Sequence, residues 1–137
     1  CLTLASAGAA VIVGVRSAER GATLHRKVAR RSMTGAVHTL PLDLSSLASV
    51  RHFATAVAGR LASGGWPPLR QLILNAGVLS MDRADTVDGV ELTFASNHLG
   101  HFLLTTLLLP TLRATGPGRR PGSRPRIASQ LNPSREC

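Results

Sequence analysis

Leu72-Ile73-Leu74-Asn75-Ala76-Gly77, together with the downstream stretch Ser96-Asn97-His98-Leu99-Gly100-His101-Phe102, decides the fold of this chain. The first stretch is a short apolar run that ends in small residues, as a buried strand does where it enters a loop. The second belongs to a long segment whose apolar residues recur at helical spacing. A buried strand, a loop of small residues and a helix, in this order, are typical of a parallel α/β sheet, in which ligands collect at the carboxyl ends of the strands.

Other apolar runs predict further strands of the same sheet. Residues 9–15 read as a strand buried on both faces, and residues 37–42 and 69–74 read as two more. Residues 126–129 look like the start of the next strand. Because helical patterns separate these runs, we predict an α/β fold with a doubly wound parallel sheet and right-handed crossovers.

The predicted helices carry recognisable start and stop signals. Leu2 to Ala5 read as the end of a helix that Gly8 stops, and Ser17 precedes the next helix as a capping residue. Ser45 or Ser46 caps a third helix, and residues 88–110 predict a long fourth helix that begins at Asp88. The apolar face of the third helix consists of Val50, Phe53, Ala54, Val57 and Leu61.

Composition narrows the class of protein. The 137 residues are 44% hydrophobic with a mean hydropathy of +0.14, which is enough for an ordinary globular core. No apolar stretch approaches the roughly 20 residues of a membrane span. Cys1 and Cys137 stand at opposite ends, which predicts neither a zinc site nor a disulfide framework. A reducing, cytoplasmic location is the default expectation.

The positive charge is concentrated near the carboxyl end. Residues 1–112 hold ten Lys/Arg and six Asp/Glu, a net of +4, whereas residues 113–137 hold six Arg and one Glu, a net of +5. Residues 114–137 form a basic, Pro/Gly/Arg-rich segment without an aromatic residue on which a base could stack. Nucleic-acid binding is therefore not favoured, and we expect a solvated basic loop with a divergent tail.

Three motifs in sequence order carry a resemblance to a known family. They are Asn75-Ala76-Gly77-Val78, Thr86-Val87-Asp88-Gly89-Val90-Glu91 and Asn97-His98-Leu99-Gly100-His101-Phe102-Leu103-Leu104-Thr105. With these motifs the chain resembles the short-chain dehydrogenase/reductase family, especially the branch of the retinol dehydrogenases and the WW-domain-containing oxidoreductase. The resemblance implies a Rossmann-like domain over residues 1–129 that moves hydride between a nicotinamide cofactor and a carbonyl or alcohol.

The resemblance also assigns cofactor contacts. Arg16 ends the strand at 9–15, where a basic residue accommodates the 2′-phosphate of NADP, so NADP is favoured over NAD. Asp43 and Leu44 would approach the adenine, and the small residues Asn75, Ala76 and Gly77 would let the backbone approach the ribose. Each position has a plainer interpretation: a charged residue closing a strand for Arg16, a helix cap for Asp43, and a strand-end turn for the loop at 75–77.

Asn97 matches the helix member of the family's catalytic Asn-Ser-Tyr-Lys group, which helps to hold a water on the proton path to the lysine. Outside that resemblance, it would be read as a helix bend or a core amide. His98 and His101 could share a helix face, but no third ligand suggests a metal site. We expect them to be packing or surface histidines.

Parts of the family pattern are absent from the sequence. The Gly-rich turn that receives the pyrophosphate would precede Leu2, and there is no tyrosine for the Tyr-x-x-x-Lys pair, with Lys27 the sole lysine. We therefore expect an incomplete Rossmann sheet, truncated at both ends, whose missing first strand divides it in two, and no hydride transfer by this chain alone. The alternative is a noncatalytic interaction module that docks through the helix at 88–110 on a full-length relative, the same helix being the one expected to form any homo- or hetero-dimer.

Overall fold

The structure, a computed structural model, describes residues 1–31, 34–114 and the backbone of 126–129. The chain divides into two compact units, Cys1–Asp43 and Leu44–Glu136. The basic segment predicted over residues 114–137 falls almost entirely outside the described residues.

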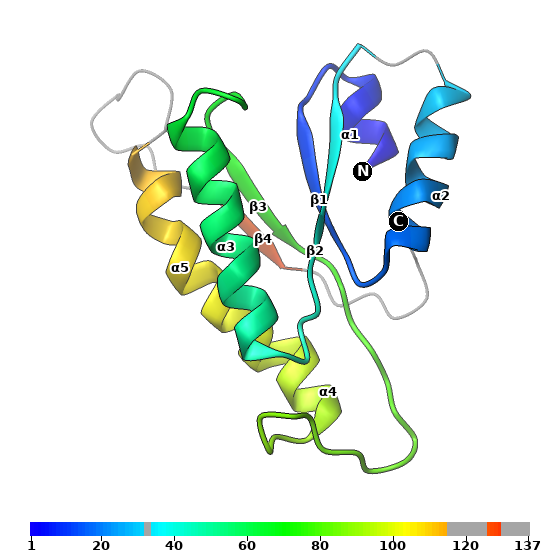
Figure 1. Cartoon of the computed structure of the whole chain (residues 1–137), viewed down its shortest axis with the longest axis vertical. Coiled ribbons are helices and arrows are strands. Elements are labelled where there is room, and N and C mark those ends of the chain that lie inside the picture. Colours follow the sequence, from blue (N-terminus) through cyan, green and yellow to red (C-terminus); the bar gives the residue numbers. More distant parts are fainter. Residues whose placement is uncertain (32–33, 115–125, 130–137) are drawn as a thin grey trace. The chain divides into compact units, whose positions relative to one another are not determined.

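The first unit is a β-α-β arrangement preceded by a short helix. Its elements are α1 (Leu2–Ser6), β1 (Val11–Val15), α2 (Ala18–Ala29) and β2 (Val37–Pro41) (Figure 1). Strands β1 and β2 pair in parallel with Val11 opposite Val37, and α2 packs against both strands. The prediction of parallel strands joined by a helical crossover is confirmed for this unit.

Local sequence signals fix the ends of these helices as expected. Gly8 follows α1 with φ of +87°, a conformation that glycine adopts without strain. The Ser17 hydroxyl accepts a hydrogen bond from the Arg20 amide at 3.3 Å and caps α2, with Glu19 in the first turn. Leu24 is the buried large side chain of α2.

The second unit contains two long helices that pack against each other, and a parallel strand pair. Its elements are α3 (Leu47–Ala62), β3 (Gln71–Leu74), α4 (Leu92–Phe94), the π-helical turn η1 (Ala95–Leu99), α5 (Gly100–Ala114) and β4 (Arg126–Ser129). Helices α3 and α5 lie side by side, and β3 pairs in parallel with β4 (Figure 1). The core of this unit comprises Val50, Phe53, Ala54, Val57, Trp66, Leu74, Ala95, Leu104, Leu108 and Leu112.

The strands form two separate two-stranded sheets, β1 with β2 and β3 with β4, in the described part of the chain. This agrees with the expected division of the doubly wound sheet. The prediction that residues 9–15 are buried on both faces is wrong, because β1 is at most half-buried along its length. A strand with a single neighbour leaves the backbone groups along its other edge unpaired, which increases its exposed fraction.

The long helix differs from its prediction at both ends. It begins after Glu91 rather than at Asp88, and it continues past Pro110 to Ala114. The Glu91 carboxylate caps it by accepting hydrogen bonds from the Thr93 and Phe94 amides at 2.8 and 2.7 Å. The Asp88 carboxylate instead accepts a hydrogen bond from the Leu47 amide at 2.8 Å, and so supports the start of α3.

Glu91 makes the start of this helix sensitive to acid. Hydrogen bonds from the amides of Thr93 and Phe94 lower the pKa of Glu91 below its ordinary value of 4.5. Its stabilising contribution is therefore full above pH 4.5 and is lost as the pH falls through the lower pKa of the folded state. We expect Glu91→Gln to unfold at lower urea concentration than the wild type at pH 7, with the difference shrinking at pH 3.

The matched control for this prediction is Glu19→Gln, because Ser17 rather than the glutamate caps α2. Urea unfolding of both variants at the two pH values measures the effect. An equal difference from wild type at pH 7 and pH 3 for Glu91→Gln would contradict the capping role.

Candidate functional site

Asn97 holds the loop that follows β3. Its side-chain amide donates a hydrogen bond to the Val78 carbonyl at 2.7 Å, and its Oδ1 accepts one from the Val78 amide at 2.8 Å. Both backbone groups of one residue are thus satisfied by one side chain, which fixes the end of the loop at 75–77. A carboxylate or an apolar residue in place of Asn97 could not supply both a donor and an acceptor in this geometry.

The π-helical turn presents Asn97 to that loop. A π turn widens the helix by one residue and commonly occurs at functional positions. Ala95 and Ser96 are buried in this turn, and the Gly100 amide closes it on the Ala95 carbonyl. Sequence periodicity predicted a continuous helix here and gave no sign of the turn.

Two close contacts attach the segment at 44–47 to the helix that carries Asn97 and to the loop that precedes this helix. A Cβ atom on Gly100 would clash with the carbonyl oxygen of Leu44, so only glycine permits this approach. The Asp88 bond to Leu47 anchors the same segment from the loop before the helix. Leu44, one of the predicted adenine contacts, is therefore positioned by residues of the third motif and the second motif together.

His101 and His98 occupy different environments on the helix. His101 is 7% exposed, and its Nδ1 lies 3.0 Å from the Asn97 carbonyl oxygen. His98 is exposed and stacks between Phe94 and Phe102, with ring centroids 5.2 and 6.5 Å away. Across the described residues, no three His, Cys, Asp or Glu side chains gather where a metal ion could bind.

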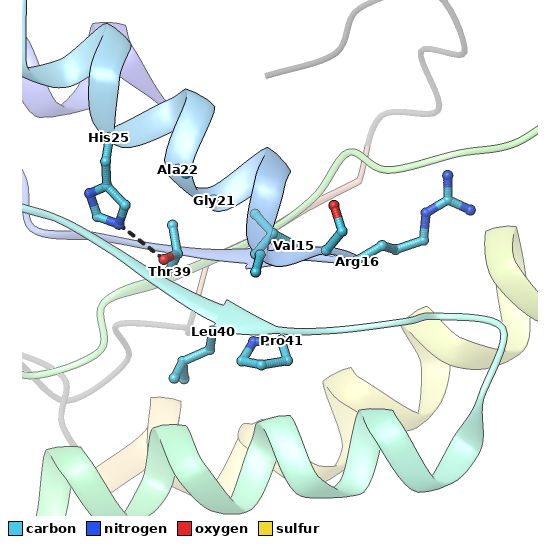
Figure 2. Close-up of a pocket in the computed structure, with 10 residues that line it drawn as sticks. Val15, Arg16, Gly21, Ala22, His25, Thr39, Leu40 and Pro41 are labelled. Carbon is cyan, nitrogen blue, oxygen red and sulfur yellow. Dashed lines mark hydrogen bonds between the residues drawn. The ribbon is translucent and has the colours of Figure 1, made fainter.

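Arg16 belongs to the first unit, at the rim of a cavity of about 410 Å³. Figure 2 shows its side chain extending away from Val15, while His25 points from α2 toward Thr39 on β2. The His25 Nε2 lies 3.1 Å from the Thr39 Oγ1. The rest of the lining is mainly small or apolar: Val15, Ser17, Ala18, Gly21, Ala22, Leu40 and Pro41.

The predicted site residues are thus divided between the two units. Arg16 and Asp43 lie in the first, whereas Leu44, the loop at 75–77 and Asn97 lie in the second. Within the second unit the structure brings Asn97 to the loop at 75–77, through Val78. Their roles toward a cofactor stay predictions.

Comparison with known proteins assigns the family. The sequence model of the short chain dehydrogenases matches residues 1–120, most of the chain. The chain belongs to the short-chain dehydrogenase family. Within this family of oxidoreductases, it is 46% identical over 121 residues to the polyprenol dehydrogenase of Mus musculus, and 38% identical over 112 residues to the WW domain-containing oxidoreductase of Gallus gallus. Human retinol dehydrogenases are similar as well.

The match covers most of this chain but a minority of each relative. It spans 88% of the chain and 34% of the mouse protein, and 82% of the chain and 26% of the chicken protein. Among solved structures, the RhlG/NADP active-site complex of Pseudomonas aeruginosa superposes with a TM-score of 0.67 at 28% identity, over 93% of this chain and 46% of that one. The chain therefore spans part of the Rossmann fold of this family.

None of the helices in the described part of the chain has the length and apolar composition that a membrane crossing requires.

Proposed function

We propose that this chain forms part of an NADP-dependent short-chain oxidoreductase and supplies contacts to the nicotinamide cofactor. The observation that carries the proposal is the double hydrogen bond between Asn97 and Val78. It holds the loop at 75–77 at the carboxyl end of β3, where ligands of open α/β sheets bind. The single methyl group of Ala76 and the lack of a side chain at Gly77 leave the loop backbone accessible to a ribose.

Arg16 supports the preference for NADP over NAD. It directly follows β1, and its guanidinium can donate paired hydrogen bonds to a phosphate dianion. The 2′-phosphate is the group by which NADP differs from NAD, so a permanent cation at this place discriminates between the two. The relative named above was itself solved as an NADP complex.

Reduction of a carbonyl needs a hydride from the nicotinamide and a proton from an acid. In the family that acid is a tyrosine assisted by a lysine, and this chain contains no tyrosine and a single lysine, Lys27, in α2. We propose that the chain alone binds the cofactor without turning over a substrate. The cytoplasmic location stays a prediction.

A melting experiment tests the proposal. Thermal unfolding is measured without ligand, with NADP and with NAD. Each cofactor is added at about 1 mM, well above an ordinary cofactor Kd. We expect NADP to raise the Tm more than NAD does, because a ligand that binds only the folded state stabilises it by mass action. Equal Tm values in all three samples would contradict the proposal.

A second candidate function is self-association through the helical segment at 92–114, favoured by an exposed aromatic stripe. Phe94 is 52% and Phe102 63% exposed, with His98 stacked between them. Exposed aromatic side chains in a row are typical of interfaces. The comparisons with relatives lend no support to a noncatalytic module.

We expect Phe102→Glu to shift the chain toward monomer in sedimentation velocity, since a charge cannot be buried unpaired in an apolar contact. Val87→Glu is the control, because Val87 is 91% exposed, more than Phe102, but lies in the loop before the helix. If the wild type self-associates and Phe102→Glu has the same sedimentation coefficient, the interface lies elsewhere on the chain.

A further inference from the structure

His101 is a buried titratable side chain that no predicted cofactor contact uses. Its Nδ1 lies 3.0 Å from the carbonyl oxygen of Asn97, one helical turn earlier. A carbonyl oxygen carries no hydrogen, so the ring nitrogen must donate the hydrogen bond. The neutral ring is therefore the Nδ1–H tautomer, the less common form of a free histidine in water.

This hydrogen bond places Asn97 under constraint from two directions. The Asn97 side chain is bonded to both backbone groups of Val78, and its own backbone carbonyl is bonded to His101. His101 is in turn fixed in its helical turn, because its backbone carbonyl accepts a hydrogen bond from the Thr105 hydroxyl at 2.8 Å. The contacts form one connected network from Thr105 to the loop that follows β3.

The π-helical turn explains why such a constraint is needed. Asn97 lies in the middle of η1, where the backbone departs from the regular α-helical path. The regular helix does not by itself set the direction of a side chain in such a turn. The His101 ring, in the next turn, donates a hydrogen bond to the Asn97 backbone carbonyl. This bond limits rotation of the Asn97 peptide plane, and so limits the direction in which the Asn97 side-chain amide points.

We propose that His101 is a positioning residue for Asn97: its Nδ1–H holds the Asn97 carbonyl so that the Asn97 amide keeps both hydrogen bonds to Val78. In this way His101 sets the geometry of the loop at 75–77 without touching the cofactor. The consequence for NADP binding rests on the function proposed above, whereas the hydrogen-bond network does not.

The first test reads the tautomer of His101 in the wild-type chain. Long-range proton–nitrogen NMR correlation spectra distinguish Nδ1–H from Nε2–H in a neutral imidazole. We expect the Nδ1–H pattern for His101 at pH 8. The Nε2–H pattern would overturn the proposal, because that ring could not donate to the Asn97 carbonyl.

The second test uses hydrogen exchange of the Val78 amide, which is protected by Asn97 Oδ1. His101→Leu keeps bulk but removes the donor, whereas His101→Asn retains a side-chain N–H near the position of Nδ1. We expect Val78 to exchange about tenfold faster in His101→Leu than in wild type, as the loss of one partly buried hydrogen bond permits. We expect His101→Asn to restore most of the protection.

The Val57 amide in the interior of α3 serves as the internal reference for global stability. Equal acceleration at Val57 and Val78, or equal acceleration in His101→Leu and His101→Asn, would show that His101 only fills space and would overturn the proposal. The NADP affinity of the same variants is measured in parallel. Suppose that His101 is the Nδ1–H tautomer and that His101→Leu accelerates exchange selectively at Val78, but the wild type binds no NADP. The positioning role then stands and the proposed function fails.

Discussion

Replacing Arg16 by glutamate is expected to weaken NADP binding by about ten- to a hundredfold while changing NAD binding little. Hydrogen bonds to a charged group are each worth about 1.5 to 3 kcal/mol, and about 1.4 kcal/mol corresponds to a tenfold change in affinity. The substitution also sets a carboxylate against the phosphate dianion. Calorimetric titration with NADP and NAD, and with 2′,5′-ADP and 5′-ADP as fragments, measures the difference that the 2′-phosphate makes.

The control is Arg31→Glu, which makes the same change of charge at an exposed arginine beyond the other end of α2. A general effect of net charge on a polyanionic ligand would weaken NADP binding equally in both variants. Equal losses, or an Arg16→Glu variant that still prefers 2′,5′-ADP over 5′-ADP, would contradict the assignment of Arg16.

Replacing Leu108 by alanine is expected to destabilise the chain by about 2 to 5 kcal/mol, the usual range for a buried leucine. Leu108 is 2% exposed, on the face of α5 that packs in the core of the second unit. Truncation removes buried apolar surface and leaves a cavity that rigid neighbours fill only in part. Since α5 continues directly from the turn that carries Asn97, we expect the loss of stability to reduce protection of the Val78 amide as well.

Leu79→Ala is the matched control, because it deletes the same atoms from a side chain that is 74% exposed. Surface substitutions of this kind change stability by about 0.5 kcal/mol or less. Chemical denaturation of both variants, with the two-state assumption checked by coincident fluorescence and circular dichroism transitions, gives the comparison. Equal unfolding midpoints for Leu108→Ala and Leu79→Ala would show that Leu108 is not packed in the core as described.

The sequence alone predicted the elements whose signals are local. The strands β1, β2, β3 and β4 were recognised as short apolar runs, and the caps of α2 and α3 as serines ahead of helical patterns. The family was recognised from three motifs, and the sequence comparison confirms it. These features depend on residues that are close together in the sequence, so a short stretch of sequence is enough to predict each of them.

Features set by contacts between distant residues were missed. Asp88 looked like the start of a helix because aspartate caps helices, but its carboxylate meets the amide of Leu47, far away in the sequence. The π-helical turn leaves the apolar pattern of residues 92–107 unchanged, so periodicity does not reveal it. The role of His101 depends on the same turn. The partial exposure of β1 follows from the number of strands beside it, which its own residues do not encode.

The most direct test of the account is a titration of the nitrogen-15-labelled chain with NADP, followed by amide chemical shifts. If the chain supplies cofactor contacts, saturable shifts will appear at the amides of residues 75–78 and at Arg16 and Ser17. Shifts confined to the exposed arginines elsewhere, without saturation and with the amides of residues 75–78 unmoved, would contradict the account.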